Sequence, residues 1–271
     1  MIKWLAAAAA ALALATSANA QVQAPEVELW RLDCGTLTIK EFNSFFFDTL
    51  EAKPGPRDVV NSCYLVRHQD QYLLWDSGLP AALIGKPNES PLLIASMTTT
   101  IADQLKQLNL TPADIDVVGI SHGHFDHTGQ AAAFPGARLV VGKGDFAGAA
   151  GESDPFGPWR AAGANVTQAT GDVDIFGDGS VVAIHLPGHT PNHLALRVNL
   201  ASGPVLLSGD LYHSTESRAL KGIPPFNTSR ADTLAAIDRF ERLAKSQNAK
   251  VIIQHEPADI AKLPAFPQAA R

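Results

Sequence analysis

Short apolar segments alternate with longer amphipathic ones along this sequence. Strands are predicted at Val27–Leu32, Ser62–Val66, Tyr72–Trp75, Val117–Ile120, Ala137–Val141, Val181–Leu186, Leu194–Leu200, Pro204–Leu207 and Lys250–Ile253. Apolar residues at helical spacing predict a helix from about Thr99 to Leu108, a longer one from about Ser229 to Ser246, and a short one near Asp145–Ala150. Because strands and helices mix with short connections, and no repeat or low-complexity linker interrupts them, the pattern favours one α/β domain over residues 21–271.

The first 20 residues follow a different pattern. Lys3 precedes an apolar run from Trp4 to about Ala15, and small residues then lead to Ala20. This order is typical of a secretory signal peptide, with cleavage expected between Ala20 and Gln21. The run is well short of the roughly 20 apolar residues that span a bilayer, so no stable membrane anchor is expected. The sequence therefore predicts export across the inner membrane to the periplasm, with the extracellular space as the alternative.

Composition and charge limit the partners of the protein. Apolar residues make up 46% of the chain and charged residues 18%, which is typical of a folded domain rather than a disordered one. The formal net charge is −6 and no run of Lys or Arg exceeds two residues, so nucleic acid is not an expected partner. Cys34 and Cys63 both lie in strand-like segments. They form a disulfide if the protein reaches an oxidising compartment, or they are two small buried residues.

Histidine and aspartate residues gather directly after the predicted strands. The segment SHGHFDH, residues 121–127, follows an apolar strand and holds His122, His124, Asp126 and His127. Three more candidates each follow another strand: His189 in LPGHTPNH, Asp210 in LLSGD and His255 in VIIQHEP. If these strand ends converge, all seven side chains share one cleft.

Seven such ligands are too many for one tetrahedral cation and suit two divalent ions. His-x-His in a turn can aim two rings at one ion, while Asp126 and His127 face a second. Zn²⁺ is the expected metal, although Co²⁺, Mn²⁺ or Fe²⁺ suit the same nitrogen and oxygen ligands. A metal pair lowers the pKa of a shared water and polarises a carbonyl, so the chemistry indicated is hydrolysis of a small molecule.

The order His-x-His-x-Asp-His, His, Asp, His resembles the metallo-β-lactamase superfamily over nearly the whole mature chain. The resemblance implies an αββα sandwich, with two mixed β-sheets flanked by helices and the metal site at one edge. It also implies a ligand set: one metal on His122, His124 and His189, a second on Asp126, His127 and His255, and Asp210 as the bridge. Asp76 matches a family aspartate that supports the ligands, or it caps a turn.

Within this superfamily the chain is most similar to the N-acyl-homoserine lactonases, in their secreted form, through stretches such as LSGDLYHSTESRA and PPFNTSRADTLAAIDRFERLAK. The implied reaction is hydrolytic opening of the lactone ring, with Asp210 as proton carrier. Several lactonases have a tyrosine three residues after the bridging aspartate; this chain has His213 there and Tyr212 one residue earlier. Alternation along an extended chain points the two to opposite sides, and either is a candidate to contact substrate.

Other functions remain open. A broader lactone, ester, thioester or β-lactam hydrolase would use the same metal centre, and a protein that sequesters metal without turnover is of another class.

Aromatic and histidine residues outside the metal motif have a binding or a structural interpretation. Phe45, Phe46 and Phe47 line an apolar groove, or they belong to the core or to a contact in a homodimer. Trp159 has the same alternatives. His193 orients a ligand or packs structurally. His68 and His185 are read as structural or exposed.

Overall fold

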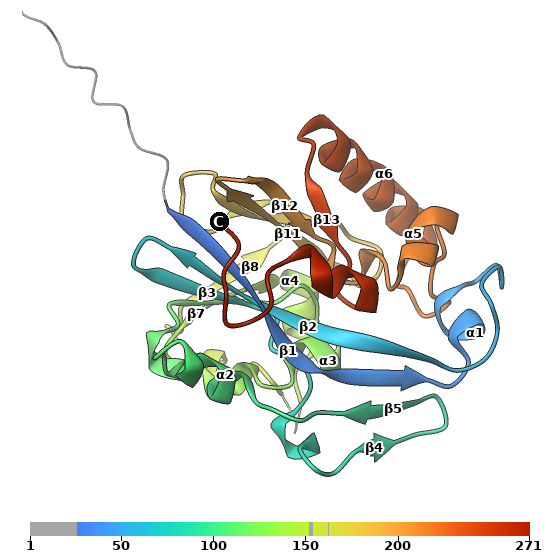
Figure 1. Cartoon of the computed structure of the whole chain (residues 1–271), viewed down its shortest axis with the longest axis horizontal. Helices are drawn as coiled ribbons and strands as arrows, with labels where there is room; N and C mark the ends of the chain where they lie inside the picture. The colour runs from blue at the N-terminus through green and yellow to red at the C-terminus, as the bar shows by residue number, and fades with distance from the viewer. Residues whose placement is uncertain (1–25, 152–153, 162) are drawn as a thin grey trace, which may run out of the picture.

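The structure, a computed structural model, describes residues 26–151, 154–161 and 163–271 (Figure 1). The predicted signal peptide, residues 1–20, lies outside the described residues. The helices are α1 (Phe42–Phe46), α2 (Ile101–Gln107), α3 (Phe125–Thr128), α4 (Lys143–Gly148), α5 (Thr215–Leu220) and α6 (Arg230–Ser246). The strands are β1 (Val27–Ile39), β2 (Arg57–His68), β3 (Gln71–Trp75), β4 (Asn88–Glu89), β5 (Leu93–Ser96), β6 (Val117–Gly119), β7 (Arg138–Gly142), β8 (Val166–Ala169), β9 (Val173–Asp174), β10 (Val181–His185), β11 (Leu194–Leu200), β12 (Gly203–Leu207) and β13 (Lys250–Ile252).

Two mixed sheets pack face to face between layers of helices. Within the described residues, the large sheet has the order β4-β5-β1-β2-β3-β6-β7-β8 and the small sheet the order β13-β12-β11-β10-β9. Strands β3, β6, β7 and β8 pair in parallel, as do β12 and β13. Figure 1 shows α5 and α6 beside the small sheet and α2 on the opposite side of the molecule. This arrangement confirms the predicted αββα sandwich.

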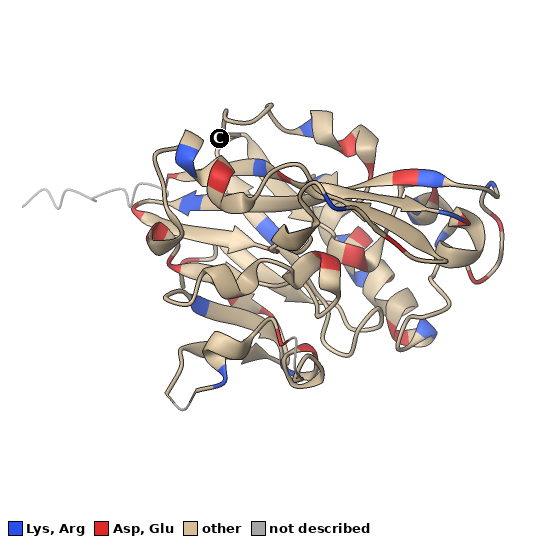
Figure 2. Cartoon of the chain, turned by 90° about the horizontal axis from the view of Figure 1, so that it is seen from below, with Lys and Arg blue, Asp and Glu red and all other residues tan. Residues whose placement is uncertain are grey.

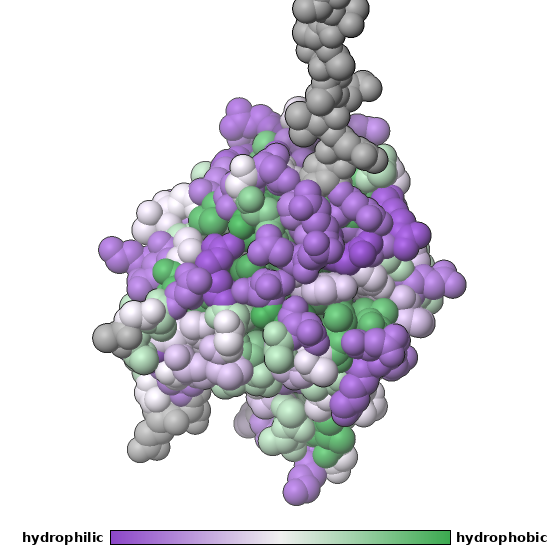
Figure 3. Space-filling model, turned by 90° about the vertical axis from the view of Figure 1, so that its left-hand side faces the viewer, coloured by the Kyte–Doolittle hydropathy of each residue, from purple (hydrophilic) through white to green (hydrophobic). Residues whose placement is uncertain are grey.

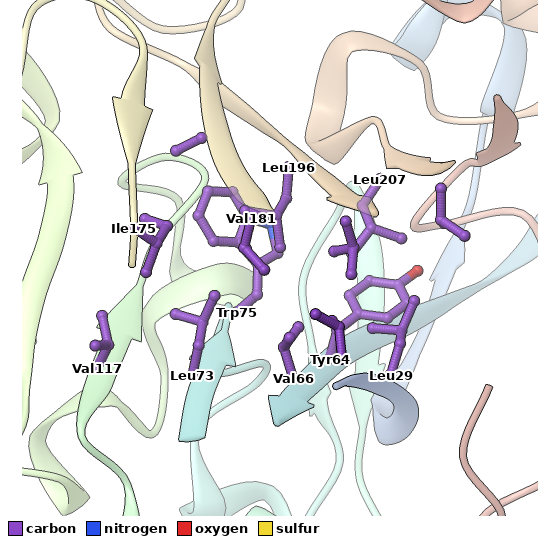
Figure 4. Packing of buried hydrophobic residues seen from close by; sticks show 14 of the residues in the cluster. Leu29, Tyr64, Val66, Leu73, Trp75, Val117, Ile175, Val181, Leu196 and Leu207 are labelled. Atoms are coloured by element: carbon purple, nitrogen blue, oxygen red, sulfur yellow. The ribbon is translucent and has the colours of Figure 1, made fainter. Parts of the chain in front are cut away.

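Period-two alternation within the strands builds these layers. In β2, Tyr64 and Val66 face the small sheet, whereas Cys63 and Leu65 face the outer layer that contains α2 and α4. Figure 4 shows side chains of the two sheets meeting between them: Val66, Leu73 and Tyr64 opposite Val181, Leu196 and Leu207. On the other side of the small sheet, Phe240 of α6 is fully buried against β12. Apolar burial on both faces of each sheet therefore fixes the strand ends at one edge.

The first two strands are longer than the pattern predicts, and they carry the disulfide. The register of β1 on β2 shifts between Asp33 and Thr36, where Gly35 has a φ of +116°. Such a bulge breaks the alternation on which the sequence prediction rests. Cys34 and Cys63 form a disulfide there, and both side chains are fully buried. Of the two sequence interpretations, the structure therefore supports the disulfide.

Several elements were not predicted. Helix α1 forms within the aromatic run that begins at Phe42, and the short strands β4, β5, β8 and β9 lie at or near sheet edges. Strands of two to four residues are too short to show a period, which explains their absence from the sequence prediction.

Acidic and basic side chains are interspersed over the molecule. Figure 2 shows Lys and Arg next to Asp and Glu along the same elements. The face in Figure 3 is mostly hydrophilic, with smaller hydrophobic areas between the polar ones. In the described parts of the chain, every helix is too short or too polar to cross a bilayer.

Candidate metal centre

All seven predicted ligands lie on connections that leave strand ends at one edge of the sandwich. His122 and His124 follow β6, and Asp126 and His127 lie in α3 directly afterwards. The other three follow the small sheet: His189 lies between β10 and β11, Asp210 after β12 and His255 after β13. Because β3, β6 and β7 run parallel to one another, and β12 runs parallel to β13, their carboxyl ends deliver these side chains to the same place.

The first group of ligands consists of His122, His124, His189 and Asp210, whose donor atoms all lie within 4.8 Å of one another. His122 Nε2 is 2.9 Å from His124 Nδ1 and 3.2 Å from His189 Nε2. His189 Nε2 is 3.1 Å from His124 Nδ1. Three imidazole nitrogens thus surround one point, with Asp210 Oδ2 3.5 Å from His122 and 3.4 Å from His189.

The second group consists of Asp126, His127 and His255, again within 4.8 Å. Asp126 Oδ2 is 3.7 Å from His127 Nε2 and 3.6 Å from His255 Nε2. Asp210 Oδ1 also faces this group, at 3.2 Å from His127 Nε2 and 3.0 Å from His255 Nε2. One carboxylate therefore presents one oxygen to each group, as a bridging ligand must.

Three of the imidazole rings form a hydrogen bond through Nδ1, on the side away from the cluster. This bond leaves Nε2 of each ring facing the cluster. The outer partners are the Asn227 amide oxygen for His189 (2.8 Å), the Val60 carbonyl for His255 (2.9 Å) and the Asp76 carboxylate for His127 (3.0 Å). Each partner only accepts, so Nδ1 carries the proton and Nε2 faces the cluster with a lone pair when the ring is neutral. Metal-bound imidazoles in proteins are commonly oriented this way.

Asp76 holds the second group in place from the side of the His127 ring that faces away from the cluster. This fully buried carboxylate accepts the Ser121 amide proton at 2.7 Å through Oδ1. Its Oδ2 accepts from His127 Nδ1 and from Gln254 Nε2, at 3.0 and 2.9 Å. Asp76 therefore holds the start of the His122 loop and a ligand ring together, which favours the supporting role over that of a turn cap alone. Gln254, which precedes His255, has no signal in the sequence that would predict this role.

The donor set fits two divalent cations. His127 Nε2 and Asp210 Oδ1 are buried and have no hydrogen-bond partner. Burial and the neighbouring His127 lower the pKa of His122 well below its usual range, and burial lowers the pKa of His124 to about 4, so these rings are neutral. Burial opposes ionisation of Asp210, but the surrounding imidazoles, His127 first, hold the pKa of this carboxyl well below its usual range. Burial opposes the charged forms of His127 and His255, but the neighbouring carboxylates, Asp210 first, raise the pKa of both rings, so a cation bound at Nε2 of either ring would displace a proton.

Of the two neighbouring candidates, His213 reaches the site and Tyr212 does not. His213 is buried, with Nε2 3.1 Å from Asp210 Oδ2, and its ring stacks on Phe46 with centroids 4.1 Å apart. Tyr212 points the other way, as alternation predicts, and its hydroxyl donates to Glu241 Oε1 of α6 at 2.8 Å. The suggestion that Tyr212 contacts substrate is therefore wrong, because its ring belongs to the packing between the small sheet and α6.

The remaining candidates divide between supporting and structural roles. His193 Nε2 accepts the Asp210 amide proton at 3.0 Å, so this residue holds the backbone of the bridging aspartate. Trp159 is buried and donates through Nε1 to Ala137 O at 2.8 Å, so it is a core residue. His68 contacts Asp178, and His185 contacts Asn192, in agreement with their structural interpretation.

An apolar pocket of about 320 Å³ opens onto the candidate metal ligands. Phe45 and Phe46 line it as predicted, whereas Phe47 is fully buried against Gly222 instead. The rest of the wall comes from separate elements that no sequence motif marks: Leu37, Ile39, Leu92, Leu93, Phe125 and Phe226. Asp210 and other candidate ligands also line this pocket, together with His213.

A two-sheet sandwich with paired His and Asp groups at one edge is the architecture of the metallo-β-lactamase superfamily. The family model of this superfamily matches residues 56–255, and the chain belongs to it. N-acyl homoserine lactonase AttM of Agrobacterium fabrum is 32% identical over 268 residues, which cover 89% of this chain and 98% of AttM. N-acyl homoserine lactonase of a Bacillus species is 26% identical over 218 residues, which cover 76% and 85% of the two chains.

Solved structures share the fold at lower identity. A mutant of AiiA from B. thuringiensis with N-decanoyl-L-homoserine at its active site aligns with a TM-score of 0.76 and 21% identity, over 90% of this chain and 98% of that one. AidC, a dizinc quorum-quenching lactonase in complex with its product, aligns with a TM-score of 0.64 and 16% identity, over 90% of each chain.

Proposed function

We propose that this protein is a dinuclear metal-dependent hydrolase that opens the ring of N-acyl-homoserine lactones and so quenches quorum-sensing signals. The observation that carries the proposal is the apolar pocket that ends on the metal ligands. It offers aromatic surface for an acyl tail and a polar inner end for the lactone. The 32% identity to a lactonase over nearly the whole chain supports the same substrate class.

The residues that line the cleft have separate roles in binding the substrate and in moving protons. The acyl tail lies against Phe45 and Phe226, which places the lactone beside Asp210 and His213. Hydrolysis adds one water across the ring C–O bond and gives a carboxylic acid and an alcohol. Asp210 is positioned to accept the proton that the attacking water loses and to pass it to the ring oxygen as that bond breaks. Burial lowers the pKa of His213 to about 4, so the ring is neutral; its Nε2–H faces Asp210 Oδ2 at 3.1 Å and would turn from that carboxylate to the substrate oxygen that develops charge.

Two divalent cations, when bound to the seven donors, supply Lewis-acid activation of the water and of the ester carbonyl. His122, His124 and His189 would hold one cation, and Asp126, His127 and His255 the other, with Asp210 shared. We propose Zn²⁺ for both, since imidazole nitrogen and carboxylate oxygen suit it. Elemental analysis of protein purified without added metal or chelator tests this identity, because Co²⁺, Mn²⁺ and Fe²⁺ suit the same ligands.

The decisive experiment follows acid release from metal-loaded protein given N-acyl-homoserine lactones with short, medium and long tails. We expect turnover, with kcat/KM rising as the tail fills the pocket. The matched control is the acyl-homoserine lactam, which has the same tail and ring size but an amide in place of the ester. No turnover of any acyl-homoserine lactone, together with hydrolysis of other lactones, esters, thioesters or β-lactams, would replace the proposed substrate with a broader one.

His213 provides a prediction about the oxyanion. Replacing it with alanine removes a donor beside Asp210, and loss of one such donor costs about 10²–10³-fold in rate. We therefore expect kcat/KM for lactone hydrolysis to fall by about 10²-fold while the metal content stays unchanged. Steady-state kinetics and elemental analysis of the same preparation measure both quantities.

Tyr212→Phe is the control for this prediction. It removes a hydroxyl one residue away whose partner is Glu241, outside the cleft. Its kcat/KM should stay within about twofold of the wild type, because isolated changes away from the reacting atoms have small effects. A His213→Ala enzyme that is as active as Tyr212→Phe would remove His213 from the mechanism.

We also propose that the protein is exported. The signal-peptide pattern of residues 1–20 supports this location, and so does the buried Cys34–Cys63 disulfide, since such bonds persist in oxidising compartments. The exported chain is expected to begin at Gln21. Amino-terminal sequencing of the protein from a periplasmic fraction checks this; a chain that still begins at Met1 there would contradict it.

A further inference from the structure

A buried carboxylate outside the seven ligands connects two of the ligand loops. Asp145 lies in α4, and its side chain is 5% exposed. Its Oδ1 accepts the amide proton of Gly123 at 3.0 Å, and its Oδ2 accepts that of Asn192 at 3.2 Å. Nothing in the sequence pattern singles this residue out, because it acts on backbone amides rather than on a motif.

The two amides belong to the loops that carry the first group of ligands. Gly123 separates His122 from His124, and Asn192 lies three residues after His189. One carboxylate thus links the loop with two of the three imidazoles to the loop with the third. It has no contact with Asp126 or with the loop of His255 among the hydrogen bonds of the described residues.

Close packing reinforces the link between α4 and the His189 loop. The Gly144 amide donates to Asn192 Oδ1 at 2.8 Å. At Gly142, an added Cβ would lie 2.4 Å from the Asn192 carbonyl oxygen, so the backbones meet at contact distance. The loop therefore has little room to shift while Asp145 holds it.

The second group has its own carboxylate of this kind. Asp76 binds His127 and Gln254 directly, and Gln254 precedes the ligand His255. Asp76 also accepts the amide proton of Ser121, before His122, but it contacts a ring only in the second group, whereas Asp145 bonds only to the loop of His122 and His124 and to the loop of His189.

We propose that Asp145 is a positioning residue that fixes His122, His124 and His189 for the first cation, independently of the second cation. The inference rests on the two-cation site of the proposed function and not on its substrate. Metal binding therefore tests it even if no lactone proves to be hydrolysed.

The test measures Zn²⁺ binding by Asp145→Asn in competition with a chromophoric chelator. The amide keeps the shape of the carboxylate but has one acceptor oxygen instead of two. We expect one of the two cations to bind about 10–100-fold more weakly, as is typical when an outer partner of a ligand is lost, and the other to bind as in the wild type. Circular dichroism and the melting temperature establish that the variant is folded.

Asp174→Asn is the matched control. Asp174 also bridges two backbone amides, those of Gly177 and Gly179, at 2.9 and 2.7 Å, in a turn beside β9. Both cations should bind this variant as they bind the wild type. If its cation binding falls as much as that of Asp145→Asn, the effect is not specific to the ligand loops and the proposal fails.

Adding Asp145→Asn to two variants, each of which lacks one candidate ligand, identifies which cation is bound more weakly. In His189→Ala the first group is already incomplete, so adding Asp145→Asn should weaken Zn²⁺ binding no further. In His255→Ala the second group is incomplete, and adding Asp145→Asn should weaken the remaining cation by the same 10–100-fold. Equal weakening in both backgrounds, or no weakening in either, overturns the proposal.

Gly144→Ala tests the same link if Asp145→Asn does not fold. An added Cβ would lie 2.9 Å from both Asn192 Oδ1 and Pro191 Cβ, which pushes the His189 loop away while the Asp145 carboxylate stays. We expect selective weakening of the first cation in this variant as well. Wild-type binding of both cations by a folded Gly144→Ala, or equal loss of both, would contradict the inference.

Discussion

Asp210→Asn is expected to lower kcat/KM for lactone hydrolysis by about 10³-fold or more, equivalent to about 4 kcal/mol of transition-state stabilisation. Asp210 is the carboxylate that faces both ligand groups, at 3.0 Å from His255 Nε2 and 3.4 Å from His189 Nε2. An asparagine keeps one oxygen, but its NH₂ group donates and cannot bind a cation. The substitution also removes the negative charge that compensates two cations in a buried site, which is costly. We therefore expect a loss of bound cation as well as of rate.

Elemental analysis and steady-state kinetics of the same preparation check both effects. Asp116→Asn is the control, since Asp116 is another carboxylate that accepts a backbone amide proton, from Tyr72, but at the start of β6 rather than beyond its end. It should keep both cations and full activity. An Asp210→Asn enzyme that retains two cations and more than about a tenth of the wild-type kcat/KM would show that Asp210 is not the shared ligand.

The clustering of the candidate ligands could be predicted because it combines residue type with position. His122, His124, Asp126 and His127 follow a recognisable apolar strand, and a cluster of this composition has few structural uses. His189 and His255 were identified by the same rule, that a polar residue directly after a buried strand lies at the sheet edge. The rule works here because both faces of each sheet are buried, as the side chains of β2 and β11 show. A polar residue can then reach a cleft only beyond the end of a strand.

The residues that hold the candidate ligands in place could not be predicted, because their contacts are with backbone atoms or between loops that are distant in sequence. Asp145 is an ordinary aspartate in the sequence, and only the approach of Gly123 and Asn192 gives it a role. The wall of the pocket is similar: Phe226 and Leu92 come from loops far apart in sequence. For Tyr212 and His213 the alternation correctly placed the two side chains on opposite sides, but the turn after β12 decides which side faces Asp210.

Gly188→Ala is expected to lower the free energy of unfolding by about 2–6 kcal/mol, the sum of backbone strain and overpacking. Gly188 has a φ of +137°, which residues other than glycine rarely adopt. An added Cβ would lie 2.3 Å from Thr233 N and 2.6 Å from Thr233 Cα in the first turn of α6. Because these are backbone atoms, no side-chain rotation relieves the contact. Thermal unfolding should show a fall in Tm of roughly 5–20 °C.

The same substitution should also weaken the first cation, because Gly188 precedes His189 and its carbonyl accepts the amide proton of Ser229, the N-cap of α6. Gly203→Ala is the control that adds backbone strain without a steric contact. The φ of Gly203 is +118°, but no atom lies within 4 Å of an added Cβ. This substitution should cost only the strain term, about 1–3 kcal/mol, and leave both cations in place. If the two variants lose equal stability and Gly188→Ala keeps both cations, the contact with α6 does not hold His189 in position. If only Gly188→Ala loses the cation, the junction of a core helix and a ligand loop fixes the metal site.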